Sequence, residues 1–189
     1  MPSLEYDLVK NIISDNNIQF NTFIETGTYK GETITKMSPL FKTLHTIEIS
    51  KKLYNKATLK LKSYDNINLH LGDSINVLNE LIPNIDDNII LFLDGHWSMG
   101  ITEKGEKEVP LIEELNIIKD KLIGNAIIII DDARLFGKGP NNSNIKVNWE
   151  NITLNNILKT IENRLEEYYF LPSILDKEDR LIIKIKNRI

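Results

Sequence analysis

The sequence predicts an α/β fold, in which helices cover both faces of one seven-stranded, mostly parallel sheet. Short apolar runs alternate with helical patterns along the 189 residues, as they do in chains that form parallel sheets. Ile89–Leu93 and Ala126–Ile130 are continuously apolar, which is typical of central parallel strands buried on both faces. The last two strand-like segments are separated only by a short turn, so they should form an antiparallel hairpin.

The first elements follow from periodicity and breaking residues. An opening helix, Ser3–Ser14, has an apolar residue every four positions: Leu4, Leu8 and Ile12. Phe20–Glu25 is a short apolar strand, and the helix Gly31–Met37 stops near Pro39, which cannot continue it.

Two further strand–helix pairs come next. Leu44–Ile49 is the second strand, and Ser50 suits the N-cap of a helix with one apolar face: Leu53, Ala57 and Leu61. Ile67–Leu71 is the third strand, and Ser74 can cap a helix with a similar face: Ile75, Leu78 and Ile82. The fourth strand is Ile89–Asp94.

The second half continues the alternation. Pro110 suits the first position of a helix with one apolar stripe: Leu111, Leu115, Ile118 and Leu122. Ala126–Asp131 is the fifth strand, and Glu150–Glu166 is the last helix. The closing hairpin consists of two strands and the turn between them: Tyr168–Leu175, Asp176–Asp179 and Arg180–Lys186.

Composition excludes several classes of protein. With 41% hydrophobic and 26% charged residues, the chain is typical of a globular domain. The net charge of -4 and the lack of a basic stripe disfavour nucleic-acid binding. The absence of cysteine excludes disulfides and thiolate metal sites. Met1–Lys10 shows no secretory signal, and Ala126–Ile130 is far shorter than the roughly 20 residues that span a bilayer. We expect a single domain over residues 1–189, located in the cytoplasm, with homo-oligomerisation left open.

The ends of the first three strands suggest a ligand site, because ligands bind beyond the carboxyl ends of parallel strands. Gly27 permits a sharp turn, and Gly31 permits close approach of a helix to a ligand. Glu48 suits a ribose diol, and Asp73 could meet an adenine amino group. Each residue also has a structural interpretation, as a turn glycine, a solvated strand end or a helix cap.

Between Phe20 and Lys186 the chain resembles the class I S-adenosylmethionine-dependent methyltransferases, starting with the motif Glu25-Thr26-Gly27-Thr28-Tyr29-Lys30-Gly31. The resemblance implies a Rossmann-like αβα sandwich and S-adenosylmethionine as cofactor. It also implies a set of cofactor-binding residues: Glu25, Thr26, Gly27, Gly31, Glu48, Gly72, Asp73 and Ser74. The dinucleotide fingerprint Gly-x-Gly-x-x-Gly is absent, which disfavours a nicotinamide oxidoreductase.

The fourth and fifth strands end in acidic residues, Asp94 on one and Asp131-Asp132 on the other. The resemblance implies that these two strands are neighbours, and neighbouring strands lie about 4.8 Å apart, so the carboxylates could share one cation. Carboxylate oxygens suit Mg²⁺ or Ca²⁺. Asp131 and Asp132 can reach the same ion only if the chain leaves strand geometry there, because successive strand residues point to opposite faces.

These acids resemble those of the metal-dependent O-methyltransferases, especially the macrocin and sugar O-methyltransferase group. The resemblance implies Asp94, Asp131 and Asp132 as Mg²⁺ ligands, Asp94 or His96 as the base, and a sugar or similar polyhydroxylated acceptor. His96 could equally belong to the metal shell or only order its loop.

Other polar residues have less specific interpretations. Arg134 could meet a substrate phosphate, and Trp97 could pack under the substrate or in the core. Glu113 and Glu114 are expected on a solvated helix face. The loops Gly95–Val109 and Arg134–Asn148 flank the expected reaction centre and could form a lid.

The sequence therefore favours an S-adenosylmethionine-dependent O-methyltransferase that acts on a small molecule. Methylation of base amino groups is disfavoured, because Asp94-Gly95-His96-Trp97 stands where such enzymes carry Asn/Asp-Pro-Pro-Tyr/Phe. The alternative is a non-catalytic module that binds a nucleoside or nucleotide-sugar, which would not need the clustered acids.

Overall fold

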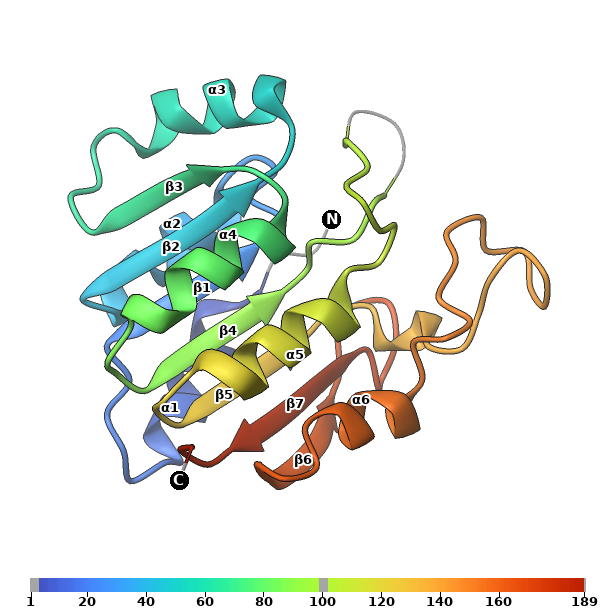
Figure 1. Cartoon of the computed structure of the whole chain (residues 1–189). Helices are drawn as coiled ribbons and strands as arrows, with labels where there is room; N and C mark the ends of the chain where they lie inside the picture. Colours follow the sequence, from blue (N-terminus) through green and yellow to red (C-terminus); the bar gives the residue numbers. More distant parts are fainter. Residues whose placement is uncertain (1–3, 99–101, 189) are drawn as a thin grey trace.

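The computed structural model describes residues 4–98 and 102–188 and contains a seven-stranded sheet in the order β3-β2-β1-β4-β5-β7-β6 (Figure 1). The first five strands are parallel, and β7 pairs antiparallel with both β5 and β6. The mostly parallel sheet with a C-terminal antiparallel hairpin is therefore confirmed. The strands are β1 (Thr22–Thr26), β2 (Thr43–Glu48), β3 (Ile67–Leu71), β4 (Ile89–Leu93), β5 (Ala126–Ile130), β6 (Leu165–Leu171) and β7 (Arg180–Ile185).

Helices cover both faces of the sheet (Figure 1). One face packs against α1 (Tyr6–Ser14), α2 (Glu32–Met37) and α3 (Lys51–Leu61). The other packs against α4 (Ser74–Leu81), α5 (Leu111–Lys121) and α6 (Leu154–Thr160). Three short 3₁₀ helices complete the described elements: η1 (Ser38–Leu40), η2 (Ile82–Asn84) and η3 (Ala133–Leu135).

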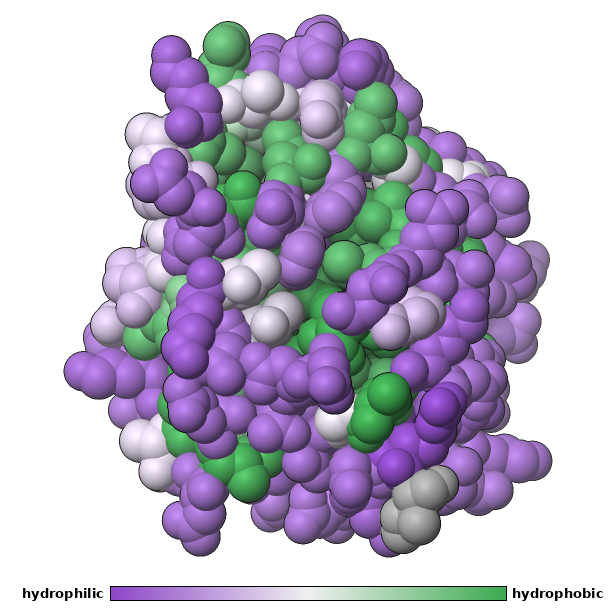
Figure 2. Space-filling model, turned by 60° about the vertical axis from the view of Figure 1, so that its left-hand side comes forward, coloured by the Kyte–Doolittle hydropathy of each residue, from purple (hydrophilic) through white to green (hydrophobic). Residues whose placement is uncertain are grey.

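The two central strands β4 and β5 are buried at every residue, as their apolar runs predict. The edge strand β3 is only partly covered. Figure 2 brings forward the side of the molecule that carries α3 and β3, where apolar residues lie within a largely hydrophilic surface. The most exposed apolar side chains of these two elements are Leu59, 70% exposed, and Leu71, 41% exposed.

The last helix differs most from the sequence-based expectation. It was expected over Glu150–Glu166, but α6 spans only Leu154–Thr160 and β6 already begins at Leu165. The Thr153 side chain accepts a hydrogen bond from the Asn156 amide and so caps the start of α6. At the other end, the buried Arg164 side chain donates to backbone carbonyls at and after the end of α5: Ile118, Lys119, Leu122 and Gly124. This long-range contact draws the chain away from its helical path.

The remaining boundaries shift by a few residues. The connection between β6 and β7 covers residues 172–179, so the turn is longer than the expected Asp176–Asp179. Ser3, the expected start of the first helix, lies outside the described residues, as do residues 99–101 of the expected loop. Within the described part of the chain, no helix is long and apolar enough to cross a membrane.

Candidate functional site

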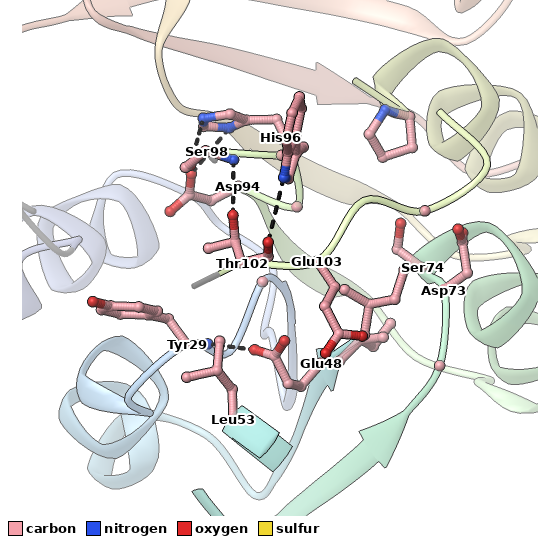
Figure 3. A pocket seen from close by; sticks show the side chains of 18 of the residues that line it. Tyr29, Glu48, Leu53, Asp73, Ser74, Asp94, His96, Ser98, Thr102 and Glu103 are labelled. Atoms are coloured by element: carbon pink, nitrogen blue, oxygen red, sulfur yellow. Dashed lines mark hydrogen bonds and ion pairs between the residues drawn. The ribbon is translucent and has the colours of Figure 1, made fainter. Parts of the chain in front are cut away.

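A cleft lies at the carboxyl ends of β1 to β4, next to the point where the strand order reverses between β1 and β4 (Figure 3). Its walls come from the loops after these strands and from residues 102–110. The space between the walls amounts to about 680 Å³, part of it open to solvent. Five of the residues expected to bind a cofactor line this cleft: Gly27, Glu48, Gly72, Asp73 and Ser74. This donor cleft thus contains residues for which the sequence predicts contacts with the methyl donor.

The loop after β1 passes very close to the end of β4. Gly27 has a φ of 88°, a conformation that favours glycine. A Cβ atom at this position would lie 2.5 Å from the backbone oxygen of Asp94. Gly31 also has a positive φ, 66°, and forms the N-cap of α2, but it does not line the cleft. Gly27 therefore controls the shape of the cleft, whereas Gly31 sets the entry into the helix.

Glu25 and Thr26, at the end of β1, are buried and do not line the cleft. The Thr46 hydroxyl donates to Glu25 Oε2 at 2.7 Å and lies 2.7 Å from the Thr28 hydroxyl. Burial raises the pKa of Glu25 to about 8, although hydrogen bonds from Thr46 and Thr33 lower it. A protonated Glu25 thus supports the loop after β1, residues 27–31, which is named the glycine loop. The support passes through Thr46 and Thr28, so any effect of Glu25 on a cofactor is indirect.

Glu48, at the end of β2, lines the cleft, and two backbone amides fix the orientation of its carboxylate. Its Oε2 accepts the Tyr29 amide at 2.8 Å (Figure 3). Its Oε1 accepts the Ser50 amide, also at 2.8 Å. Burial raises the pKa of Glu48, while the two amide hydrogen bonds counteract that rise. Each carboxylate oxygen keeps a further lone pair, so Glu48 can accept hydrogen bonds from a diol.

Asp73 acts as a helix cap as well as a cleft residue. Its Oδ1 accepts the Ile75 amide at 2.9 Å, so Asp73, rather than the expected Ser74, caps α4. The second oxygen accepts the Glu106 amide at 3.2 Å. Nearby, the Ser50 hydroxyl donates to Glu103 at 2.8 Å. The segment around Glu103 and Glu106 therefore lies over the strand ends that carry Glu48 and Asp73.

Three potential ligand groups converge beyond β4 and β5. Asp94, His96 and Asp132 each offer one atom within 4.8 Å of the others. His96 Nδ1 lies 3.5 Å from Asp94 Oδ1, and His96 Nε2 lies 3.1 Å from Asp132 Oδ2. Asp132 has a φ of 61°, so the chain does leave strand geometry here, as the sequence argument required. This turn directs Asp132 toward Asp94 and His96.

Asp131 lies in a different environment. Its Oδ1 is 3.6 Å from Nε of the buried Arg180, and it groups with Asp132 and Asp179. Arg134 pairs with Asp132 and donates to both oxygens of Asp179, at 2.7 and 2.8 Å. The Arg134 guanidinium, which the sequence suggests for a substrate phosphate, is therefore already engaged by two carboxylates.

Asp94, His96 and Asp132 form the acidic cluster, in which two carboxylates lie close together. Removal from water raises the pKa of Asp94 well above its ordinary value, and the charges of Asp131 and Asp132 raise it further. Burial and Asp132 raise the pKa of Asp131 to about 6, whereas Arg180 lowers it. Burial lowers the pKa of His96, which favours a neutral imidazole that can accept a proton.

This donor set fits a divalent cation. Two carboxylates repel each other unless a proton or a metal ion compensates their charge, and Asp94 shows this repulsion. The convergence of ligand atoms from Asp94, His96 and Asp132 within 4.8 Å would allow them to share one ion. Carboxylate oxygens suit Mg²⁺, and the imidazole would also suit a transition metal.

Sequence reasoning was wrong about Glu114. It was expected on a solvated helix face, but it is 1% exposed. Burial raises its pKa to about 7, while the hydroxyls of Ser74 and Thr26 lower it. Helical spacing contained the signal, because Glu114 is three residues after Leu111 and four before Ile118, on the apolar stripe. Trp149 and Arg180 were also missed, because they come from segments far away in sequence.

Neither a protein-family model nor a curated protein matches the sequence. Solved structures do match over nearly the whole chain. The O-methyltransferase TomG from Streptomyces achromogenes, solved with S-adenosylmethionine, has a TM-score of 0.65 and 13% identity, covering 97% of this chain and 78% of TomG. An rRNA methylase from Streptococcus thermophilus has a TM-score of 0.60 and 14% identity over 100% and 99% of the chains.

A third match is an S-adenosylmethionine-dependent methyltransferase from Clostridium acetobutylicum, with a TM-score of 0.61 and 13% identity over 96% of this chain and 90% of that one. The protein therefore has the α/β Rossmann-like fold of the S-adenosylmethionine-dependent methyltransferases. The acceptors in these names differ, so the fold similarity alone does not identify one.

Proposed function

We propose that the protein is an S-adenosylmethionine-dependent O-methyltransferase, assisted by Mg²⁺, that methylates a hydroxyl of a sugar or similar polyhydroxylated small molecule. One observation carries the proposal: the donor cleft, lined by Gly27, Glu48 and Asp73, also contains Asp94 and His96 of the acidic cluster. A module that only binds a nucleoside would need the first part of this arrangement and not the second. The net charge of -4 favours a small-molecule acceptor over nucleic acid.

The donor would be held by groups at three strand ends. Glu48 would accept hydrogen bonds from the ribose hydroxyls, and Asp73 with Ser74 would face the adenine. Gly27 and Asp94, which line the same part of the cleft, would flank the methionine part. Gly31, Glu25 and Thr26 would act by holding the glycine loop in shape.

Methyl transfer then requires removal of one proton from the acceptor. The acceptor oxygen forms a bond to the methyl carbon as the carbon–sulfur bond breaks, and the bonding pair stays on sulfur to give S-adenosylhomocysteine. The hydroxyl proton passes to His96 or Asp94, the two bases that line the cleft. A Mg²⁺ ion held by Asp94 and Asp132, with Asp131 or His96 completing the set, would lower the pKa of the hydroxyl.

Asp94→Asn tests the proposal directly. We expect this variant to bind S-adenosylmethionine with wild-type affinity but to lose at least about 100-fold in turnover, because it lacks a base and metal ligand. Calorimetric titration of the donor, with and without Mg²⁺, and transfer of a radiolabelled methyl group to a panel of sugars measure the two quantities. Asp65→Asn, an exposed residue in the loop before β3, is the matched control.

The outcomes separate the candidate functions. Full turnover in Asp94→Asn would refute the role of Asp94. Donor binding without Mg²⁺ binding, even in the presence of a diol, would refute metal assistance. Donor binding with no transfer to any hydroxyl would favour the non-catalytic module.

A further inference from the structure

Residues 102–107, named the strap, lie across the donor cleft at the carboxyl ends of β2 and β3. The Ser50 hydroxyl, just after β2, donates to Glu103 Oε1 at 2.8 Å. The Glu106 amide donates to Asp73 Oδ2, just after β3, at 3.2 Å. The strap is therefore bound to the two strand ends that would hold the ribose and the adenine of the donor.

Gly105 brings the backbone of the strap into direct contact with Asp73. An added Cβ atom at Gly105 would overlap with Asp73 Oδ2 and would lie 3.1 Å from a methyl carbon of Ile49. No further group fits between residue 105 and this oxygen. The other oxygen, Asp73 Oδ1, caps α4 through the Ile75 amide. The strap thus covers the oxygen of Asp73 that the helix cap leaves for an adenine amino group.

The strap is held in the cleft only weakly. It contains no hydrophobic residue, and its four charged side chains are exposed: Glu103, Lys104, Glu106 and Lys107. It also places a second carboxylate near Glu48. Burial raises the pKa of Glu48, and the charge of Glu103 raises it further. A segment with few buried apolar contacts opens at low free-energy cost.

The chain on the C-terminal side of the strap is anchored independently of the cleft. The Trp97 amide donates to the Glu108 carbonyl at 2.8 Å, and Glu108 Oε2 accepts the Asn148 amide at 3.0 Å. Neither contact involves Ser50 or Asp73. The strap can therefore leave the cleft while the segment that leads into α5 keeps its place.

We propose that the strap is autoinhibitory: in the free protein it occupies the adenine end of the donor cleft, and the donor displaces it from Asp73 in order to bind. This inference rests on the proposed methyltransferase function, which assigns the donor to this cleft. Displacement replaces the Glu106 amide at Asp73 by the adenine amino group and separates the carboxylates of Glu103 and Glu48. A displaced strap differs from a lid, because donor binding exposes the strap but protects a lid that closes over the donor.

Limited proteolysis distinguishes the strap from a lid. Trypsin can cut the strap after Lys104 and after Lys107, and mass spectrometry identifies the cuts. We expect saturating S-adenosylhomocysteine to speed cutting at these sites at least about threefold, because the displaced strap loses its contacts with Ser50 and Asp73. Cutting after Lys177, in the exposed connection between β6 and β7, is the control and should keep its rate. Slower or unchanged cutting of the strap would overturn the proposal, and slower cutting would indicate a lid.

Two substitutions weaken the closed strap in different ways. Gly105→Ala adds an atom that overlaps with Asp73, and Glu103→Ala removes the contact with Ser50. We expect each variant to bind S-adenosylhomocysteine about 3- to 10-fold more tightly than the wild type in calorimetric titration, because Asp73 is covered in a smaller fraction of molecules. Glu106→Ala is the matched control. It removes the same charge but keeps the amide that donates to Asp73, so its affinity should stay within about twofold of the wild type.

The titrations also separate this inference from the proposed function. If S-adenosylhomocysteine binds neither the wild type nor Gly105→Ala, the donor is wrongly assigned and the proposed function itself is wrong. If the wild type binds it and both variants bind it equally well or more weakly, the donor cleft stands and the autoinhibitory strap is wrong. Binding to Gly105→Ala but not to the wild type would support both.

Discussion

Glu48 illustrates how individual side chains shape this site. The backbone amides of Tyr29 and Ser50 orient its carboxylate, so it can face a ligand without side-chain rearrangement. The sequence could place Glu48 near a strand end, because Leu44–Ile49 has the pattern of a strand and Ser50 follows as a helix cap. It could not show these two amide contacts, since they depend on how two loops fold around β2.

Replacing Glu48 by alanine should weaken donor binding at least about 10-fold. The ribose hydroxyls would lose the carboxylate that accepts their two hydrogen bonds, and the amides of Tyr29 and Ser50 would lose their partner. Calorimetric titration with S-adenosylhomocysteine measures the affinity. Glu80→Gln, an exposed position in α4, is the control. An unchanged affinity in Glu48→Ala would show that the ribose does not bind there.

The residues proposed to react could be predicted only in part from the sequence. Asp94 and His96 are two positions apart, which was enough to expect them together. The separation of Asp131 from the Asp94–His96–Asp132 group depends on the backbone turn at Asp132 and on Arg180, which comes from β7. The spacing of residues along the chain reveals neither the turn at Asp132 nor the long-range contact with Arg180.

At the scale of elements, strands were easier to predict than the segments that connect them. β3 matches the expected Ile67–Leu71 because its alternating apolar residues lie between polar turns. The expected Glu150–Glu166 helix was wrong because Arg164 binds carbonyls near the end of α5, and local propensity cannot report such a contact. The β1–α2 loop was recognisable from its glycines, although not its contact with β4.

Substitution of Gly27 by alanine should destabilise this loop. The positive φ costs an alanine of the order of 1 kcal/mol, and the Cβ atom would in addition clash with the Asp94 carbonyl 2.5 Å away. Gly137→Ala is a matched control, because Gly137 has a φ of 73° but an added Cβ would meet only a Thr153 methyl at 3.9 Å.

Thermal denaturation and titration with S-adenosylhomocysteine measure the two effects. We expect Gly27→Ala to lower the Tm more than Gly137→Ala and to abolish donor binding. Equal shifts in the Tm of the two variants would show that the contact with β4 is unimportant.

At the scale of the whole molecule, buried acids under the sheet edge tie stability to pH. Glu25 has a pKa of about 8 in the folded protein against 4.5 as its ordinary value. The folded state therefore binds more protons than the unfolded state between these values. The stability linked to Glu25 is fully present below pH 4.5 and is lost as the pH rises through 8.

His45 acts in the opposite direction at lower pH. Its Nδ1 lies 3.0 Å from Nε2 of His70, and burial followed by the charge of His70 lowers its pKa from 6.5 to about 4. The stability linked to a neutral His45 is present above pH 6.5 and is lost as the pH falls through 4.

Between pH 6.5 and 8 the Glu25 contribution should dominate over that of His45. We expect the Tm of the wild-type protein to fall across this range, and the Tm of Glu25→Gln to fall less, because a glutamine can still accept the Thr46 hydroxyl without titrating. Thermal unfolding at several pH values measures both slopes. Parallel slopes would mean that Glu25 is not protonated in the folded protein.

Arg180, at the start of β7, contacts two acidic residues that are far apart in the sequence, Glu5 and Asp131. Its guanidinium bonds to Glu5 at 2.5 Å, next to α1, and approaches Asp131 at 3.6 Å. Arg180 thus links Glu5, the N-cap of α1, to Asp131, which lies beside the proposed metal ligands. A truncation or fusion that displaced Glu5 would leave the buried Arg180 with Asp131 as a remaining carboxylate partner, so a change near Glu5 would alter the charge balance beside the proposed metal ligands.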